Sequence, residues 1–259
     1  MNGFLYKELL QHKNTLIFCA CMPFLLIAVM FLFIPMTVGV SDAGFRDSLT
    51  ELFDSRILPF VPVFTFFIIG MFQSSLFQLD ELKKWGYFAA AQPDGIRRSI
   101  YAKYVVCFCM SIITLFSATI TDMLLIMLDY LVRGTAKEEI LSLSGVLPVI
   151  LFIQLFLRAV DYPFTVRFGT TRGAKVKVGI IAGAILIACI YLLFGDLPEQ
   201  LGDWFLAAAD FYEKLIKGEA TDWVYLILGI FMWLAMGAYL LSYRISCKLY
   251  LKGVEQYDH

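Results

Sequence analysis

Residues 16–40 read LIFCACMPFLLIAVMFLFIPMTVGV, without a single charged side chain. A helix needs about 20 predominantly apolar residues to cross the roughly 30 Å hydrocarbon core of a bilayer, so this stretch is long enough to span a membrane. Lys7 and Lys13 precede it, as basic residues precede the apolar part of a secretory signal peptide. The run is too long for a signal peptide, however, and no convincing small-residue cleavage site follows it. We therefore expect it to be retained as a true membrane span.

The rest of the chain has the same character. Hydrophobic residues make up 60% of the sequence and charged residues only 17%, whereas about a quarter of the residues in soluble domains are charged. Five further apolar segments follow the first, at residues 57–79, 104–130, 143–165, 178–195 and 222–245. The sequence therefore predicts an all-α membrane protein with six transmembrane helices, forming one domain over residues 1–259.

The distribution of basic residues predicts the orientation of these spans. With the N-terminus inside, fourteen Lys and Arg residues fall in inner segments and six in outer segments, while Arg158 lies within a span. Cytoplasmic loops of membrane proteins carry an excess of Lys and Arg. Both termini and residues 80–103 and 166–177 are therefore predicted to be cytoplasmic.

Cysteine and histidine usage gives no sign of a redox or metal centre. Each cysteine falls in or beside an apolar run, which favours packing within helices over disulfides or metal binding; the six are Cys19, Cys21, Cys107, Cys109, Cys189 and Cys247. The histidines, His12 and His259, lie near opposite ends of the chain. Motifs for nucleotide phosphates, zinc proteases and serine hydrolases are missing, so we predict that the chain is no enzyme and holds no cofactor.

Three segments outside the spans have helical amphipathic patterns. Before the first span, Phe4, Leu5, Leu9 and Leu10 fall on one side and Lys7, Glu8, Gln11 and His12 on the other, which is typical of a short helix in the membrane interface. Residues 44–57 and 197–216 show apolar stripes and are predicted to form short extracellular helices. The second of these is predicted to close the outer exit, with Trp204, Phe205 and Phe211 as gate residues.

Polar residues within the spans are candidates for a substrate cavity, because ionisable and polar groups at membrane depth are costly. Asp122 and Asp129 share one face of the third span, but both fall toward its outer end. Arg158 has two interpretations: it lines a polar cavity with Gln73 and Gln154, or it pairs with Asp161 on its own helix.

The most basic stretch between two spans is FQLDELKKWGYFAAAQPDGIRRSIYAKY, residues 77–104. Its first half predicts a short helix that carries Trp85, Tyr87 and Phe88 beside two lysines, and residues 93–95 (Pro-Asp-Gly) break that helix. Aromatic and Arg side chains are typical anchors of protein interfaces. We therefore predict a docking element for a cytoplasmic partner; the alternative is a basic loop that only fixes topology and touches lipid headgroups.

This stretch resembles the first cytoplasmic loop of type-2 ABC exporter permeases, the six-span membrane subunits of bacterial ATP-driven exporters. YPFTVRFGTTRGAKVK at residues 162–177 is similar to the loop between spans four and five of that family, and FLYKELL at residues 4–10 is similar to its N-terminal opening. The chain departs from the family pattern at Thr170 and Thr171, where an acidic or more charged sequence is expected.

The resemblance implies a multi-pass permease in the bacterial plasma membrane. It further implies pairing with a second permease copy, as a homodimer or a related heterodimer, and with cytoplasmic ATPase subunits that bind ATP and Mg. Residues of both loops would form coupling helices that dock on the ATPase; these are Glu81, Lys84, Trp85, Tyr87, Phe88, Gln92, Pro93, Arg97, Arg98, Arg167, Phe168, Gly169 and Arg172. The substrate would be a hydrophobic or amphipathic molecule such as a peptide, toxin or drug. A gradient-driven transporter or channel, or a scaffold subunit without transport, are the alternatives.

Overall fold

The computed structural model describes residues 2–37, 61–77, 89, 91–133, 145–194 and 222–255. Every regular element within these ranges is a helix. They are α1 (Asn2–Gln11), α2 (Lys13–Thr37), α4 (Val61–Ser74), the 3₁₀ helix η2 (Ser75–Phe77), α7 (Gly95–Arg133), α8 (Leu147–Phe194) and α10 (Asp222–Glu255). The described part of the chain thus confirms the all-α class.

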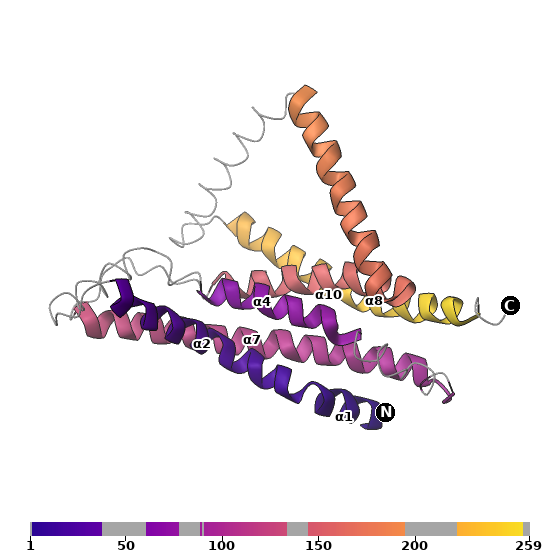
Figure 1. Ribbon diagram of the computed structural model, residues 1–259, viewed down its shortest axis with the longest axis horizontal. Coiled ribbons are helices and arrows are strands. Elements are labelled where there is room, and N and C mark those ends of the chain that lie inside the picture. Colours follow the sequence, from indigo (N-terminus) through magenta and orange to yellow (C-terminus); the bar gives the residue numbers. More distant parts are fainter. Residues whose placement is uncertain are drawn as a thin grey trace.

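Helix α7 is the centre of the arrangement. It packs against α1, α2, α4, η2, α8 and α10, and Figure 1 shows it running alongside α2 and α4. Among the described helices, α8 and α10 make the most extensive pairing. The bundle therefore has α7 as a common partner of its N-terminal and C-terminal halves.

Four stretches of the described helices are long and apolar enough to cross a membrane: Lys13–Leu32, Gly95–Leu131, Leu147–Gly169 and Tyr225–Tyr250. Helix α4, over Val61–Ser74, is a shorter apolar helix. Large apolar side chains face outward from this bundle, and Trp233 of α10 is 81% exposed. Such a surface is stable in lipid, which marks the chain as a membrane protein. The count of six spans stays a prediction.

Two helices extend past the predicted span ends. Helix α7 begins at Gly95 and not near residue 104. Residues 166–177, predicted as a cytoplasmic connection with a coupling helix, are helical within α8, which runs from Leu147 to Phe194 as two helices joined across a kink. Its helical geometry is broken only at Gly169 (φ 74°, ψ 168°), and in Figure 1 the part of α8 beyond this break turns steeply away from the other helices.

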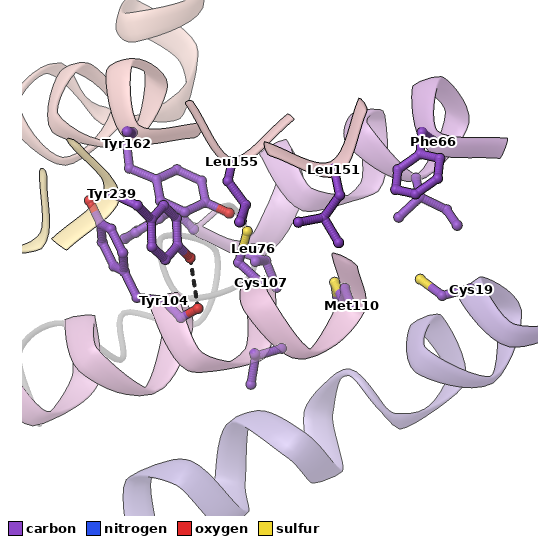
Figure 2. Packing of buried hydrophobic residues seen from close by; sticks show 14 of the residues in the cluster. Cys19, Phe66, Leu76, Tyr104, Cys107, Met110, Leu151, Leu155, Tyr162 and Tyr239 are labelled. Atoms are coloured by element: carbon purple, nitrogen blue, oxygen red, sulfur yellow. Dashed lines mark hydrogen bonds between the residues drawn. The ribbon is translucent and has the colours of Figure 1, made fainter. Parts of the chain in front are cut away.

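The core combines aliphatic, aromatic and sulfur-containing side chains. Cys19 of α2, Phe66 of α4, Met110 of α7 and Leu151 of α8 lie in one buried cluster, part of which Figure 2 shows. Cys107 and Cys247 belong to the same cluster, and the cysteines whose side chains are described are free thiols. These thiols therefore pack as small apolar groups.

Candidate docking site and buried polar network

A compact turn leads into α7. The backbone N–H of Gln92 donates to the carbonyl of Ala89 (3.3 Å), and the N–H of Gly95 donates to the carbonyl of Gln92 (3.0 Å). A Cβ atom at Gly95 would overlap the carbonyl oxygen of Ala89, so this close approach requires glycine. Asp94 has a φ of 55° and accepts the N–H of Arg98 at 3.0 Å. The predicted Pro-Asp-Gly break is therefore a tight, hydrogen-bonded turn.

The turn presents polar groups to the surface. Gln92, Pro93, Arg97 and Arg98 are exposed. Arg97 pairs with Asp94 at 3.8 Å, but both side chains are more than half exposed, so this ion pair contributes little stability. The two guanidinium groups thus remain accessible to a partner. The other predicted docking residues of this loop, Glu81, Lys84, Trp85, Tyr87 and Phe88, lie outside the described residues.

The second predicted docking element lies at the break in α8. Arg167 and Phe168 are exposed, and the ring of Phe168 stacks on Phe164 with centroids 6.4 Å apart. Gly169 supplies the break itself, while the side chain of Arg172 lies outside the description. The predicted gate residues Trp204, Phe205 and Phe211 also lie outside the described ranges, as do both predicted extracellular helices.

The three predicted cavity residues lie where α4 meets α7 and α8. Gln73 of α4 donates from Nε2 to Ser111 Oγ (2.8 Å) and to the Cys107 carbonyl (3.4 Å). Gln154 of α8 donates from Nε2 to the carbonyl of Phe66 on α4 at 3.2 Å. Each amide therefore joins two helices.

Arg158 shares features of both predicted interpretations. Its Nη1 donates to Asp161 Oδ2 at 2.9 Å, so the pairing on its own helix is confirmed. A Cβ at Gly70 would lie 3.3 Å from Arg158 Nη2 and 3.4 Å from Gln154 Nε2, which places both side chains against α4. Arg158 and Gln154 are thus brought together, one turn of α4 away from Gln73.

A hydroxyl network around Tyr104 was not anticipated from the sequence. The hydroxyl of Tyr104 lies 2.7 Å from Ser242 Oγ and 2.9 Å from Ser246 Oγ, both on α10. Tyr239 donates to the carbonyl of Tyr104 at 2.8 Å, the bond drawn in Figure 2. Ser242 in turn donates to the carbonyl of Ala159 on α8 at 2.6 Å. The network therefore links α7, α8 and α10.

An ionic cluster beneath the turn was also missed. Lys103 of α7 is 3% exposed, and its Nζ lies 3.6 Å from Oε2 of Glu8, which is 1% exposed. Glu8 also accepts from Lys7 Nζ at 2.9 Å and lies 3.6 Å from His12 Nε2. The sequence predicted α1, but not that Glu8 and His12 on its polar side would be buried against other helices. The one feature of the sequence that could have indicated this cluster was the carboxylate of Glu8 on a helix expected at the membrane surface.

Metal ligands do not gather within this part of the molecule: among the described residues no group of three or more His, Cys, Asp or Glu side chains is placed to hold an ion. Asp122 and Asp129 are both buried in α7. The described polar groups therefore form helix-joining contacts and an exposed basic turn.

The chain matches a known protein family. The family described as ABC-2 family transporter protein matches residues 3–251. Comparisons with curated proteins and with solved structures give no match.

Proposed function

The chain belongs to the ABC-2 transporter family, and from this membership we propose that it is the permease subunit of an ATP-driven exporter. The match over nearly the whole chain is the observation that carries the proposal. A permease of this family is a membrane subunit that works with an ATPase partner. We propose further that its substrate is hydrophobic or amphipathic, such as a peptide, toxin or drug, and leaves a bacterial cell across the plasma membrane.

The partner ATPase would dock on the segment that leads into α7 and includes its first turn, here termed the docking segment (residues 78–98). Its hydrogen-bonded turn from Ala89 to Gly95 and its exposed Arg97 and Arg98 support this proposal. A stiff turn transmits motion that a loose loop would absorb, and the guanidinium groups suit an acidic partner surface. Trp85, Tyr87 and Phe88 would add the aromatic anchors. Residues Arg167, Phe168, Gly169 and Arg172 would form the second contact.

Transport would require α4 to separate from α7 and α8. In the described state the Nε2 groups of Gln73 and Gln154 donate hydrogen bonds that join these helices. Separation would release both amides and the guanidinium of Arg158 toward a polar cavity for substrate. Such rigid-body movement between two packed arrangements is a common form of switching. On the outer side, Trp204, Phe205 and Phe211 would close the exit.

Two further parts of the proposal concern assembly. Both termini and the docking segment would lie in the cytoplasm, as the distribution of Lys and Arg predicts. A second permease copy, identical or related, would complete the pathway across the membrane. The large outward-facing apolar surface of the bundle is compatible with either lipid or a second copy as neighbour.

Co-purification with a candidate ATPase, followed by a hydrolysis assay, tests the proposal. The double variant Arg97→Glu/Arg98→Glu places like charges against an acidic partner surface, so we expect at least a tenfold loss of bound ATPase. The matched control is Arg244→Glu/Lys248→Glu, which makes the same charge change at exposed positions of α10. Both variants should elute normally on a sizing column. Equal retention or equal loss of the ATPase in the two variants would contradict docking at residues 78–98.

A further inference from the structure

The ends of the docking segment are held together by one buried side chain. The segment begins directly after Phe77, the last residue of η2, and ends in the first turn of α7. Lys103 lies on α7 about two helical turns beyond Gly95. Its Nζ donates to the carbonyl of Leu76 at 2.8 Å and sits 5.1 Å from the centroid of the Phe77 ring. Lys103 thus connects Leu76 and Phe77, which precede the docking segment, to α7, in which the segment ends.

The chemistry of Lys103 suits this position. Carbonyl groups in the last turn of a helix lack partners within the helix, and a cationic side chain satisfies them and interacts favourably with the helix dipole. The face of the Phe77 ring attracts the same ammonium group. An apolar side chain could fill the space but could not bind the carbonyl of Leu76.

The same ammonium group connects the docking segment to α1. Glu8 Oε2 lies 3.6 Å from Lys103 Nζ, and both side chains are almost fully buried. Burying an ion pair costs desolvation energy that the attraction between the charges often only offsets, so such a pair is weak evidence for stability alone. It does impose a specific geometry, because removing either partner takes one stabilising contact from a charge that stays buried.

From these contacts we infer that Lys103 is a positioning residue for energy coupling. It acts as a clasp, because it holds Leu76 and Phe77, which precede the docking segment, against α7, in which the segment ends, and holds both against α1. Movement of the docking segment is then passed to α4, α7 and α1 as one unit. Without the clasp, the ATPase still docks, but its movement is absorbed at the joint between η2 and α7. The inference rests on the proposed function, since it assigns the mechanical link from that docking site to the bundle.

The test separates docking from coupling in the intact complex with its ATPase. Lys103→Met keeps an unbranched side chain but loses the charge, and Lys103→Met/Glu8→Gln also neutralises the buried carboxylate that has lost its contact with Lys103. For both we expect bound ATPase and basal hydrolysis within about twofold of the wild type, with about a tenfold loss of substrate-stimulated hydrolysis. Lys103→Arg retains the charge and should recover part of the stimulation. Lys248→Met, at an exposed position of α10, is the control and should behave as the wild type.

The outcomes separate a failure of the proposed function from a failure of the role inferred for Lys103. If the wild type binds no ATPase, the proposed function fails. If the wild type binds and both neutral variants keep full stimulation, only the clasp is overturned. A parallel loss of basal and stimulated hydrolysis in both neutral variants would also overturn it, because that pattern indicates a purely structural residue.

Discussion

Tyr104 shows how a single residue organises the interior of this bundle. Its hydroxyl group contacts Ser242 and Ser246, its carbonyl accepts from Tyr239, and its ring lies 5.1 Å from that of Tyr162. Polar groups within a bilayer must find partners inside the protein, because lipid offers none. The network therefore both satisfies these groups and fixes α10 and α8 relative to α7.

Replacing Tyr104 with Phe should lower the free energy of unfolding by about 1–2 kcal/mol. The ring is kept, while two hydrogen bonds that average roughly 0.6 kcal/mol each in membrane proteins are lost. Denaturant unfolding in detergent measures the change. Tyr225→Phe, at a half-exposed position of α10, is the control and should have no measurable effect. Equal stability of the two variants would show that the network does not stabilise the bundle.

Sequence reasoning identified part of the polar interior and missed the rest for a physical reason. Gln73, Gln154 and Arg158 stood out because polar side chains are rare in apolar runs. Lys103 and Tyr104 were noted only as the end of the stretch that resembles the family loop, and their burial was not predicted, since Tyr and Lys are ordinary residues at the edge of a membrane span. Their importance comes from partners on distant helices, and a single sequence does not reveal these pairings.

At the scale of helices, hydropathy located the elements but not their ends. The first span was predicted at residues 16–40 and α2 covers Lys13–Thr37, whereas α7 starts nine residues before the predicted span. Hydropathy marks the part of a helix in lipid, while the helix itself continues into polar sequence as long as its backbone bonds are satisfied. The predicted coupling element at residues 166–177 is likewise helical on both sides of the break at Gly169.

Gly169→Ala should strain the break in α8. The observed φ and ψ of Gly169 fall in a region that is essentially restricted to glycine, so a side chain there costs about 1–3 kcal/mol. Gly183→Ala is the matched control on the same helix, because a Cβ there meets no atom within 4 Å. Thermal unfolding should show a loss for the first variant and no loss for the second. A neutral Gly169→Ala would mean that the helix straightens without penalty.

At the scale of the whole molecule, the bundle has an apolar exterior around a partly polar interior. Trp233 and Leu234 of α10, Phe67 of α4 and Leu32 of α2 are exposed, while Gln73 and Glu8 are buried. This is the arrangement that a hydrocarbon environment favours. Together with membership of the ABC-2 family, it supports a membrane subunit.

Cysteine labelling from outside the cell tests the proposed orientation. Arg97→Cys is well suited to probe the predicted cytoplasmic end because Arg97 is 62% exposed, whereas Ser99 at the same end is buried. Ser48→Cys and Glu219→Cys probe the predicted outer side. Labelling of the unmodified chain measures the contribution of the native thiols. Above this level, we expect an impermeant reagent to label the outer positions in intact cells and to label Arg97→Cys only after permeabilisation. Labelling of Arg97→Cys in intact cells would invert the topology.

The hydroxyl network can form only after α10 has been synthesised. Tyr104 and Ser246 are 142 residues apart in the chain, and at roughly 5–20 residues per second a ribosome needs on the order of 10 s to travel between them. During that interval Ser242 and Ser246 of α10 are not yet in place to contact the Tyr104 hydroxyl. A chain that stops at residue 220 should therefore be cleared faster in a pulse-chase experiment than the full-length Tyr104→Phe variant. Cellular quality control would in this way detect an unfinished permease by the absence of its last helix.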